Sequence, residues 1–571
     1  MTGRPNVLWI STHDINPHLG AYAGVYPGAD YARTPNLDRL AAEGMRFDKA
    51  FAAAPICAPS RSAIFTGCFP TAIGTMHMRT KAAPPPEVRL FTEHLREAGY
   101  YTTNNSFTDF QVNTPASAFD DCSGTAHWRN RPSPDTPFFA AFHGMTTHES
   151  QIYLDDEAFL RRTSHVGDDD RHDPALAPLP PYYPDTEVFR RCWARYNDLI
   201  TEMDHWVGEL LAQLEEDGLA EDTIVVFWSD HGLGMPRGKR WANDSGLHEP
   251  LIVRWPGRVA AGSAYTDPVH LMDLAPTTLA LCGVEVPAHV HGRPFLHADG
   301  RPVPAPNEYV FAGRDRQGET EDRTRSARDG RYRYLRHHHP DRSPMQHCDY
   351  PDHLATWAEF RRFAAAEAGQ LAKGERPSLL TPLQRRVVAA SKPAEELYDL
   401  LEDPYEEHDL AADPAHAATL ERFRAAVDGW LAEFGDLGEL AEVDLLERWR
   451  PGGVWPVAAV PELGPGGGAA SATCATAGAS VVWTTDPPRE QAHPAGRVAG
   501  AGGMGEATGA PVQDGRHWWL LCAATPPPAD VPVWLKACRT GCLDSGELPV
   551  PARLPSGELP VPDGVPTPQW G

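Results

Sequence analysis

The sequence has no hydrophobic run long enough to cross a membrane. No stretch of its 571 residues approaches the ~20 consecutive apolar residues of a spanning helix. The segment Met1 to Pro5 leads directly into the apolar run Asn6 to Ser11, which leaves no room for a signal peptide. We therefore expect a cytoplasmic protein that does not interact with membranes.

Basic residues are scarce relative to acidic ones. The chain has 51 Lys and Arg against 77 Asp and Glu, which gives a formal net charge of -26. This charge disfavours nucleic acid and anionic membranes as partners, so an anionic substrate would need a local positive site. The ten cysteines follow no regular framework, which is typical of reduced thiols rather than of a disulfide-bonded exported protein.

Short apolar runs alternate with amphipathic segments in the first half of the chain. This order predicts an α/β fold, with a largely parallel sheet sandwiched by helices. The best predicted strands are Val7 to Ser11, Phe138 to His143 and Thr223 to Ser229. Apolar residues at helical spacing from Phe189 to Leu214, followed by Gly218, predict a long helix. Shorter helices are predicted to start near Thr34 and Leu90.

The pattern changes after about residue 300. A strand-like segment at Tyr332 to Leu335 and a helix at Ala417 to Glu433 predict a smaller α+β subdomain. A Gly-Pro-rich segment indicates a linker, and Ser-Gly-Glu-Leu-Pro-Val-Pro occurs twice near the end. We expect a catalytic domain (1–330), a C-terminal subdomain (331–455), a linker (456–468), a small β-sandwich-like module (469–548) and a Pro-rich tail (549–571).

Polar side chains follow the ends of the three strongest predicted strands. They are His13 and Asp14, then His143 with His148 beyond it, and finally Asp230 and His231. Ligands of open parallel sheets bind beyond the carboxyl ends of the strands. The carboxylates suit Ca²⁺ or Mg²⁺, and the imidazoles leave Mn²⁺ or Zn²⁺ open. An alternative is that Asp14 and Asp230 only cap helices.

The most specific motif is Cys57-Ala58-Pro59-Ser60-Arg61, followed by Thr66-Gly67. It resembles the signature that the formylglycine-generating enzyme reads in sulfatases. A cysteine at a helix N-terminus beside an arginine lies in positive potential, which favours its oxidation. The alternative is a buried structural cysteine before a helix.

The resemblance to sulfatases covers about residues 4–435. Segments similar to sulfatase blocks are Arg4 to Ser11, Thr34 to Leu40, Ser229 to Gly232 and Glu396 to Asp399. Tyr182 to Met203 and Pro236 to Pro250 look closest to heparan N-sulfatase, also called sulfamidase, and its bacterial relatives. The family implies an alkaline-phosphatase-like fold and a divalent metal, most often Ca²⁺.

The resemblance also implies roles for individual residues. Hydrated formylglycine at position 57 would attack sulfur and Arg61 would hold its diol, while His148 and Lys239 would contact sulfate or the leaving group. The residues that match metal positions are Asp14, Asp230 and His231, with His13 left open as a ligand or a neighbour. The residues expected to bind substrate are His143, Arg314 and Asp315.

One position departs from the family pattern. Ser106-Phe107-Thr108-Asp109 stands where many relatives carry Gly-Lys-x-His, so Phe107 replaces a lysine of the sulfate site. Losing one such cation can cost on the order of 3 kcal/mol of transition-state stabilisation. We predict a sulfatase acting on a sulfate ester or sulfamate, expected on a small sulfated sugar. The alternatives are a phosphonate monoester or phosphodiester hydrolase and a catalytically weak protein that binds sulfated ligands.

Overall fold

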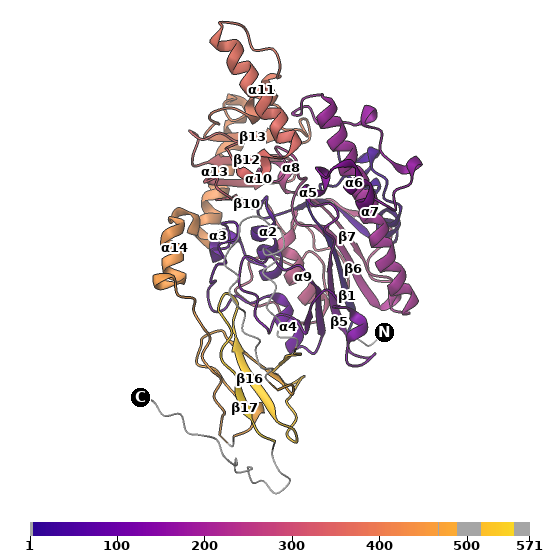
Figure 1. Cartoon of the computed structure of the whole chain (residues 1–571), viewed down its shortest axis with the longest axis vertical. Coiled ribbons are helices and arrows are strands. Elements are labelled where there is room, and N and C mark those ends of the chain that lie inside the picture. Colours follow the sequence, from indigo (N-terminus) through magenta and orange to yellow (C-terminus); the bar gives the residue numbers. More distant parts are fainter. Residues whose placement is uncertain (1–3, 466, 488–515, 553–571) are drawn as a thin grey trace.

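The computed structural model describes residues 4–465, 467–487 and 516–552 (Figure 1). Within these residues, the largest sheet has nine strands in the order β4-β3-β5-β1-β6-β7-β2-β8, with β9 beside β2. The strands are β1 (Asn6–Thr12), β2 (Met45–Phe51), β3 (Tyr101–Asn105), β4 (Asp121–Cys122), β5 (Phe138–His143), β6 (Thr223–Ser229), β7 (His248–Arg254), β8 (Ser263–Tyr265) and β9 (Val269–His270). The run from β4 to β6 is parallel, whereas β7 is antiparallel to its neighbours. The predicted α/β class and the three predicted strands are confirmed.

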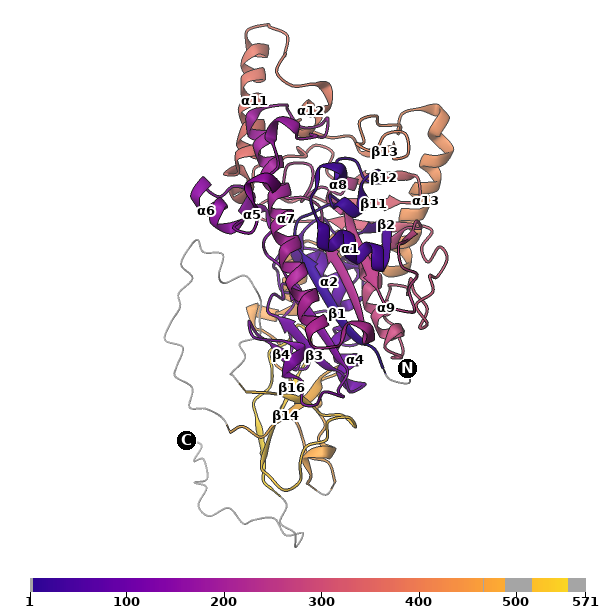
Figure 2. The ribbon, with the colours of Figure 1, turned by 90° about the vertical axis from the view of Figure 1, so that its right-hand side faces the viewer.

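Helices cover both faces of this sheet (Figures 1 and 2). Successive side chains of β1 point to opposite faces, so both sets must be apolar. Trp9 packs against Phe65 and Phe91 on one face, while Leu8 and Ile10 lie in the core of the other. The first face carries α2 (Cys57–Thr66), α4 (Phe91–Glu97) and α9 (Leu274–Leu281), and the second carries α1 (Pro35–Glu43) and α7 (Glu187–Glu216).

The long predicted helix is α7. The Thr186 hydroxyl accepts a hydrogen bond from the Phe189 amide at its start, which satisfies a free N–H of the first turn. Its end precedes Gly218, which has the left-handed φ of 69° that glycine adopts without strain. The remaining short helices of the catalytic half are α3 (Pro70–Ile73), α5 (Glu149–Ile152), α6 (Asp156–Arg162) and α8 (Asp244–Leu247).

A second, antiparallel sheet of four strands lies above the first in Figure 1. Its strands are β10 (Val310–Arg314), β11 (Thr324–Arg328), β12 (Tyr332–His337) and β13 (Glu395–Asp399). Helix α13 (Ala417–Phe434) packs on it through Phe423 and Trp430. The domain boundary expected at residue 330 falls in the short turn between the paired strands β11 and β12, so this sheet extends across it. The other helices here are α10 (Asp349–Asp352), α11 (Ala355–Ala372), α12 (Pro382–Val387) and α14 (Glu442–Trp449).

The small β module forms a third sheet at the opposite end of the molecule from α11 (Figure 1). In the parts of the chain that the structure describes, it is one antiparallel sheet in the order β15-β14-β16-β17. The strands are β14 (Ser480–Thr484), β15 (Trp519–Leu520), β16 (Val533–Cys538) and β17 (Leu548–Val550). Part of the expected linker packs with this module, since Glu462 pairs with Thr473. The second copy of the repeat, Ser556 to Pro562, and the tail from residue 553 onward lie outside the described residues.

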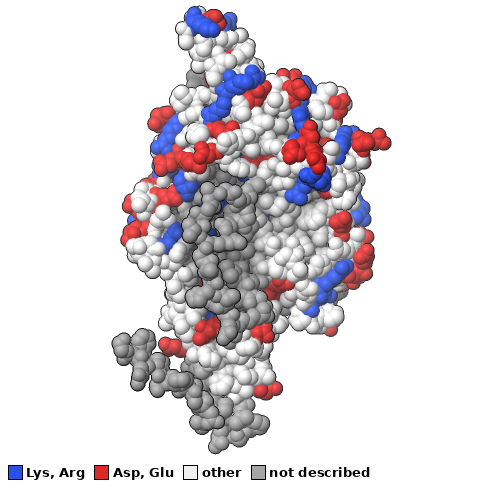
Figure 3. All heavy atoms as spheres, in the orientation of Figure 1, with Lys and Arg blue, Asp and Glu red and all other residues white. Residues whose placement is uncertain are grey.

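Acidic and basic side chains are interspersed on the face shown in Figure 3. All ten cysteines are free. No helix among the described residues is both long and apolar enough to cross a membrane.

Candidate active site

The carboxyl ends of β1 and β6 bring four titratable side chains together. These strands are parallel neighbours whose last residues, Thr12 and Ser229, are paired. The residues that follow are therefore adjacent in space: His13 and Asp14 after β1, and Asp230 and His231 after β6. All four are fully buried. Asp14 has a left-handed φ of 55°, an unfavourable conformation for a side-chain-bearing residue and of a kind that clusters at functional sites.

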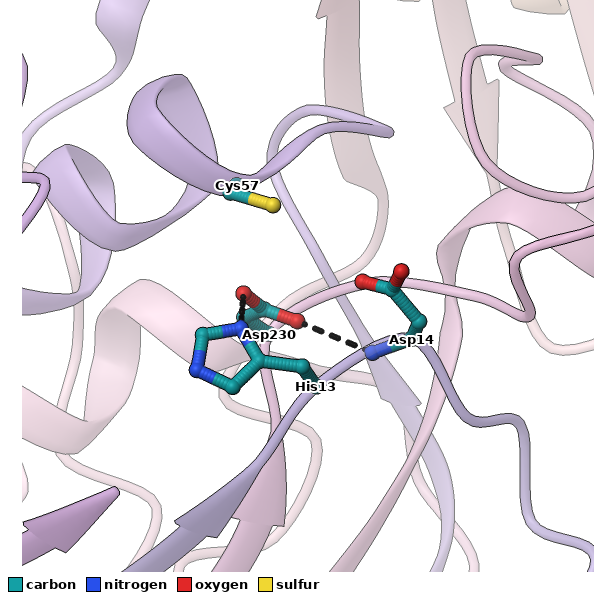
Figure 4. A group of neighbouring side chains, drawn as sticks. All are labelled: His13, Asp14, Cys57 and Asp230. Atoms are coloured by element: carbon teal, nitrogen blue, oxygen red, sulfur yellow. Dashed lines mark hydrogen bonds and ion pairs between the residues drawn. The ribbon is translucent and has the colours of Figure 1, made fainter. Parts of the chain in front are cut away.

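Asp14 and Asp230 form a buried pair of carboxylates. The Asp14 amide donates to Asp230 Oδ1 at 3.3 Å, and His13 Nδ1 lies 2.9 Å from Asp230 Oδ2 (Figure 4). Burial by itself would raise both pKa values. The nearby charge of Lys239 lowers the pKa of Asp14, and the His231 and His13 charges hold that of Asp230 well below its usual range. Both carboxylates are therefore ionised at neutral pH.

Cys57 is the first residue of α2 and faces this pair (Figure 4). Its Sγ lies 3.1 Å from His231 Nε2, and the Ser60 hydroxyl on the same helix donates to the Asp230 carbonyl. Burial raises the pKa of the Cys57 thiol, against the lowering effect of the Lys239 charge. Desolvation thus outweighs the attraction of nearby cations for the thiol, and the expectation that this setting favours oxidation of Cys57 stays a prediction.

The cluster has the donors of a metal site. One potential ligand atom from each of His13, Asp14, Cys57 and Asp230 lies within 4.8 Å of the others, and Asp14 forms a second such group with His148 and Glu149. His231 Nε2 lies 3.3 Å from Asp14 Oδ1. Two ionised carboxylates in a fully buried site need positive charge beside them, which a divalent cation supplies. The residues present therefore fit a divalent metal.

Lys239 and Glu149 complete the charge balance around Asp14. Lys239 Nζ donates to Asp14 Oδ2 at 2.9 Å and lies 3.1 Å from Glu149 Oε1. Burial lowers the pKa of Lys239, but the negative charges of Asp14 and Glu149 raise it by more than burial lowers it. The net pKa is above the usual value, so the side chain stays charged. Arg240 binds both oxygens of Glu149 at 2.8 Å. The loop fits here because Gly234 has no Cβ, which would lie 2.2 Å from Glu149 Cβ.

His148 caps the N-terminus of α5 and points its other nitrogen into the site. Its Nδ1 accepts from the Ser150 amide at 3.3 Å, so the neutral ring carries its proton on Nε2. That Nε2 lies 3.5 Å from Lys239 Nζ. Burial and then the Lys239 charge lower the pKa of His148 to about 4. The ring is therefore neutral at pH 7 and can donate from Nε2.

Arg61 and His143 form the opposite wall. The fully buried Arg61 donates to the carbonyls of Thr108 (2.9 Å) and Phe107 (3.1 Å), and its Nη2 lies 3.4 Å from His143 Nδ1. Arg61 Nη1 is buried and has no hydrogen-bond partner among the described residues. His143 Nε2 lies 2.8 Å from Asn104 Oδ1. Arg61 thus presents one free guanidinium nitrogen.

Arg314 and Asp315 lie at the end of β10 and pair elsewhere. Arg314 Nη1 donates to Asp322 Oδ2 at 2.8 Å, and both oxygens of Asp315 accept from Arg325 at 2.9 and 3.0 Å. Arg314 also lies over the Trp241 ring, at 6.0 Å, beside a cavity of about 90 Å³. The structure therefore ties these two residues into the C-terminal sheet rather than into the cluster around Cys57.

Sequence reasoning missed Glu149 and Arg240. Each directly follows a predicted site residue, His148 and Lys239 respectively, and that adjacency was the only local signal. Their bidentate contact joins loops 91 residues apart in the chain, which no spacing rule reveals.

The sequence is similar to those of known proteins. A family model described as Sulfatase matches residues 5–284. A protein of Formosa agariphila, described as an ulvan-active sulfatase, is 36% identical over 519 residues, which cover 84% of this chain and 83% of the relative.

Solved structures share the fold at low sequence identity. A structure described as a complex with the substrate D-glucosamine-2-N,6-O-disulfate has a TM-score of 0.52 and 18% identity, covering 76% of this chain and 98% of that one. The phosphonate monoester hydrolase of Silicibacter pomeroyi has a TM-score of 0.54 and 20% identity, covering 76% and 96%. These likenesses concern the fold alone.

Proposed function

Because this chain belongs to the sulfatase family and is a sulfuric ester hydrolase, we propose that it removes sulfate from a carbohydrate through a formylglycine made from Cys57. The observation that carries the proposal is the meeting of Cys57 with the buried Asp14 and Asp230 carboxylates at the ends of two parallel strands. Burying a charge costs free energy unless the charge is paired or binds a metal. Two ionised carboxylates buried opposite Cys57 therefore indicate a functional site rather than a purely structural cysteine.

The site residues divide into two groups by chemistry. Asp14, Asp230 and His231 would hold the metal, with His13 either a further ligand or the partner that orients Asp230. When present, the metal would withdraw charge from sulfate oxygens and the formylglycine would supply the nucleophilic hydroxyl. Ca²⁺ suits the carboxylates best, with Mn²⁺, Mg²⁺ or Zn²⁺ as alternatives.

The second group would bind sulfate and move protons. Arg61 would donate from its free Nη1 to the nucleophile, and Lys239 would contact a sulfate oxygen as charge develops there. His148 would donate a hydrogen bond from Nε2 to the departing oxygen or nitrogen, and it would transfer a proton only after the ring itself has taken one up, which leaves the ring neutral. His143 stays a candidate substrate contact through its position beside Arg61.

The proposed substrate class is based on a relative that matches most of this chain. The Formosa agariphila protein is described as active on ulvan, so we propose a sulfated sugar within a polysaccharide or its fragments. An N-sulfated glucosamine is the alternative, based on the sulfamidase-like segments Tyr182 to Met203 and Pro236 to Pro250. Arg314 and Asp315 would affect substrate binding indirectly, by holding the C-terminal sheet in place through their ion pairs with Asp322 and Arg325.

A substrate panel tests the proposal. The protein, purified from a host that makes formylglycine, is assayed with 4-nitrophenyl sulfate, sulfated ulvan oligosaccharides, N-sulfoglucosamine and 4-nitrophenyl phenylphosphonate. Highest kcat/KM on a sulfate ester supports the proposal, whereas highest kcat/KM on the phosphonate would favour a phosphonate hydrolase. Binding of sulfated oligosaccharide without turnover of any substrate would favour a binding protein.

Mass spectrometry of the Cys57 peptide is the second arm. We expect conversion of the thiol to an aldehyde or its hydrate, and loss of turnover in Cys57→Ala. Cys68→Ala is the matched control, because Cys68 is also fully buried and lies just beyond α2. An unmodified Cys57 thiol in an active enzyme would overturn the formylglycine mechanism.

A further inference from the structure

An open groove of about 380 Å³ begins at the wall of the candidate active site. It runs between the end of β5, the loop that follows it, and helices α6 and α7, which lie side by side in Figure 1. Its lining includes the polar and aromatic side chains of Asn105, His127, His143, Arg162, Trp206 and Gln213. The volume lies within the range of small-molecule sites, so the groove can hold a sugar unit.

One side chain separates the groove from the catalytic cluster. His143 lines the groove, and its Nδ1 lies 3.4 Å from Arg61 Nη2. Arg61 stands one helical turn after Cys57 on α2. The groove therefore lies next to the catalytic cluster, with the buried His143 as the wall between the two.

Trp206 gives the groove an aromatic surface. Its ring is half-buried on α7, although tryptophan on a helix that packs against a sheet is usually covered. A Cβ at Gly144 would lie 2.7 Å from a carbon of this ring, so only a glycine lets the loop after β5 lie against the indole edge. The ring is thus held in place from one side and available from the groove. Sugars present apolar C–H faces that pack on such rings.

Arg162 gives the groove an uncommitted positive charge. No carboxylate among the described residues lies within 4 Å of it, although its neighbour Arg161 pairs with Glu157. The Arg162 Nε is buried without a hydrogen-bond partner in the described part of the chain, and its Nη2 reaches the Met145 carbonyl at only 3.5 Å. A guanidinium in this state binds carboxylate or sulfate oxygens well.

We propose that this groove binds the sugar unit next to the sulfated one in an oligosaccharide. Trp206 packs on the C–H face of that sugar, and Arg162 pairs with an oxyanion substituent, either a uronate carboxylate or a second sulfate. The groove makes the protein selective for oligosaccharides over single sugars. This inference rests on the proposed function for the position of the sulfated unit.

Binding is measured first without turnover, so that failure of the proposed activity does not obscure the result. In a Cys57→Ala background, calorimetry compares a sulfated monosaccharide with size-fractionated ulvan tetrasaccharides. We expect the tetrasaccharide to bind about tenfold more tightly or better, and Trp206→Ala to remove most of that difference. Trp206→Phe, which keeps an aromatic face, should retain it. Equal affinity for the two lengths, or an unchanged ratio in Trp206→Ala, would overturn the inference.

The charged contact is tested with Arg162→Gln and its matched control Arg161→Gln, an exposed neighbour on the same helix. Arg162→Gln should weaken tetrasaccharide binding about tenfold, while Arg161→Gln should leave it as in the parent. Carboxyl-reduced tetrasaccharide separates the two anions: the effect of Arg162→Gln disappears if the partner is a carboxylate and persists if it is a sulfate. Equal binding by Arg162→Gln and Arg161→Gln on the native tetrasaccharide would show that Arg162 does not contact the substrate.

Discussion

The guanidinium carbon of Arg61 lies 4.8 Å from the centre of the Phe107 ring, and the same arginine donates to the Phe107 carbonyl. The ring also meets the edge of His13 at 4.8 Å between centroids. Phe107 therefore packs between two charged or polar site residues, at the position where many sulfatases carry a lysine. The arginine–ring contact contributes about 0.5–2 kcal/mol in such a setting. We therefore expect that the wall of the site is formed around Phe107 and that the site has not simply lost a cation there.

The first prediction follows from this contact. Phe107→Lys should lower kcat/KM for 4-nitrophenyl sulfate about tenfold, because an ammonium beside the buried Arg61 introduces repulsion on the order of 1–3 kcal/mol. Phe107→Leu is the control that removes the ring without adding charge, and it should cost less. A tenfold rise in Phe107→Lys with an intact fold would instead show that the site lacks a cation.

The second prediction concerns the metal. Asp14→Asn and Asp230→Asn should each lower bound divalent metal per chain, measured by elemental analysis after dialysis, and reduce turnover by a hundredfold or more, about 3 kcal/mol. Asp273→Asn removes another fully buried carboxylate outside the cluster and should leave the metal content unchanged. His13→Ala reports whether His13 is a ligand. Full metal occupancy in both cluster variants would mean that the site lies elsewhere.

The third prediction concerns His148 as a proton donor. His148→Gln should slow hydrolysis of an alkyl sulfate by roughly 10²–10⁴-fold, but that of 4-nitrophenyl sulfate much less, because a good leaving group needs no proton. A plot of log kcat against leaving-group pKa should therefore become steeper. His165→Gln, an exposed histidine paired with Glu202, is the control. Equal losses on both substrates would assign His148 a positioning role only.

The fourth prediction concerns stability at acid pH. Burial and the Arg293 charge lower the pKa of His270 to about 3, and its Nε2 accepts from the Phe311 amide. Below pH 6.5 the unfolded chain binds a proton that the folded chain excludes, so stability falls as the pH falls from 6.5 toward 3. The contribution of this histidine at pH 5 is about 2 kcal/mol.

The measurement compares urea unfolding at pH 7.5 and pH 5 in the parent and in His270→Gln. The variant should lose stability at pH 7.5 but show a pH dependence smaller by about 2 kcal/mol. An identical pH dependence in both proteins would show that His270 is protonated in the folded state.

Local pattern determined much of the framework. The strands that end at Ser11, His143 and Ser229 are continuous apolar runs because both faces of the sheet are covered, and the helical spacing from Phe189 to Leu214 follows from one buried face. The motif around Cys57 pointed to the family without structural help. These features lie within single segments, so the sequence alone could reveal them.

Only the tertiary structure decided how the segments meet. The parallel register of β1 and β6 places Asp14 against Asp230, and burial at that meeting point raises the pKa of the Cys57 thiol. The same packing ties Asp315 to Arg325 and pairs Glu149 with Arg240. The physical reason is that desolvation and ion pairing depend on groups that are distant in sequence. Their energies are set by which groups the folded chain packs around a charge and at what distance.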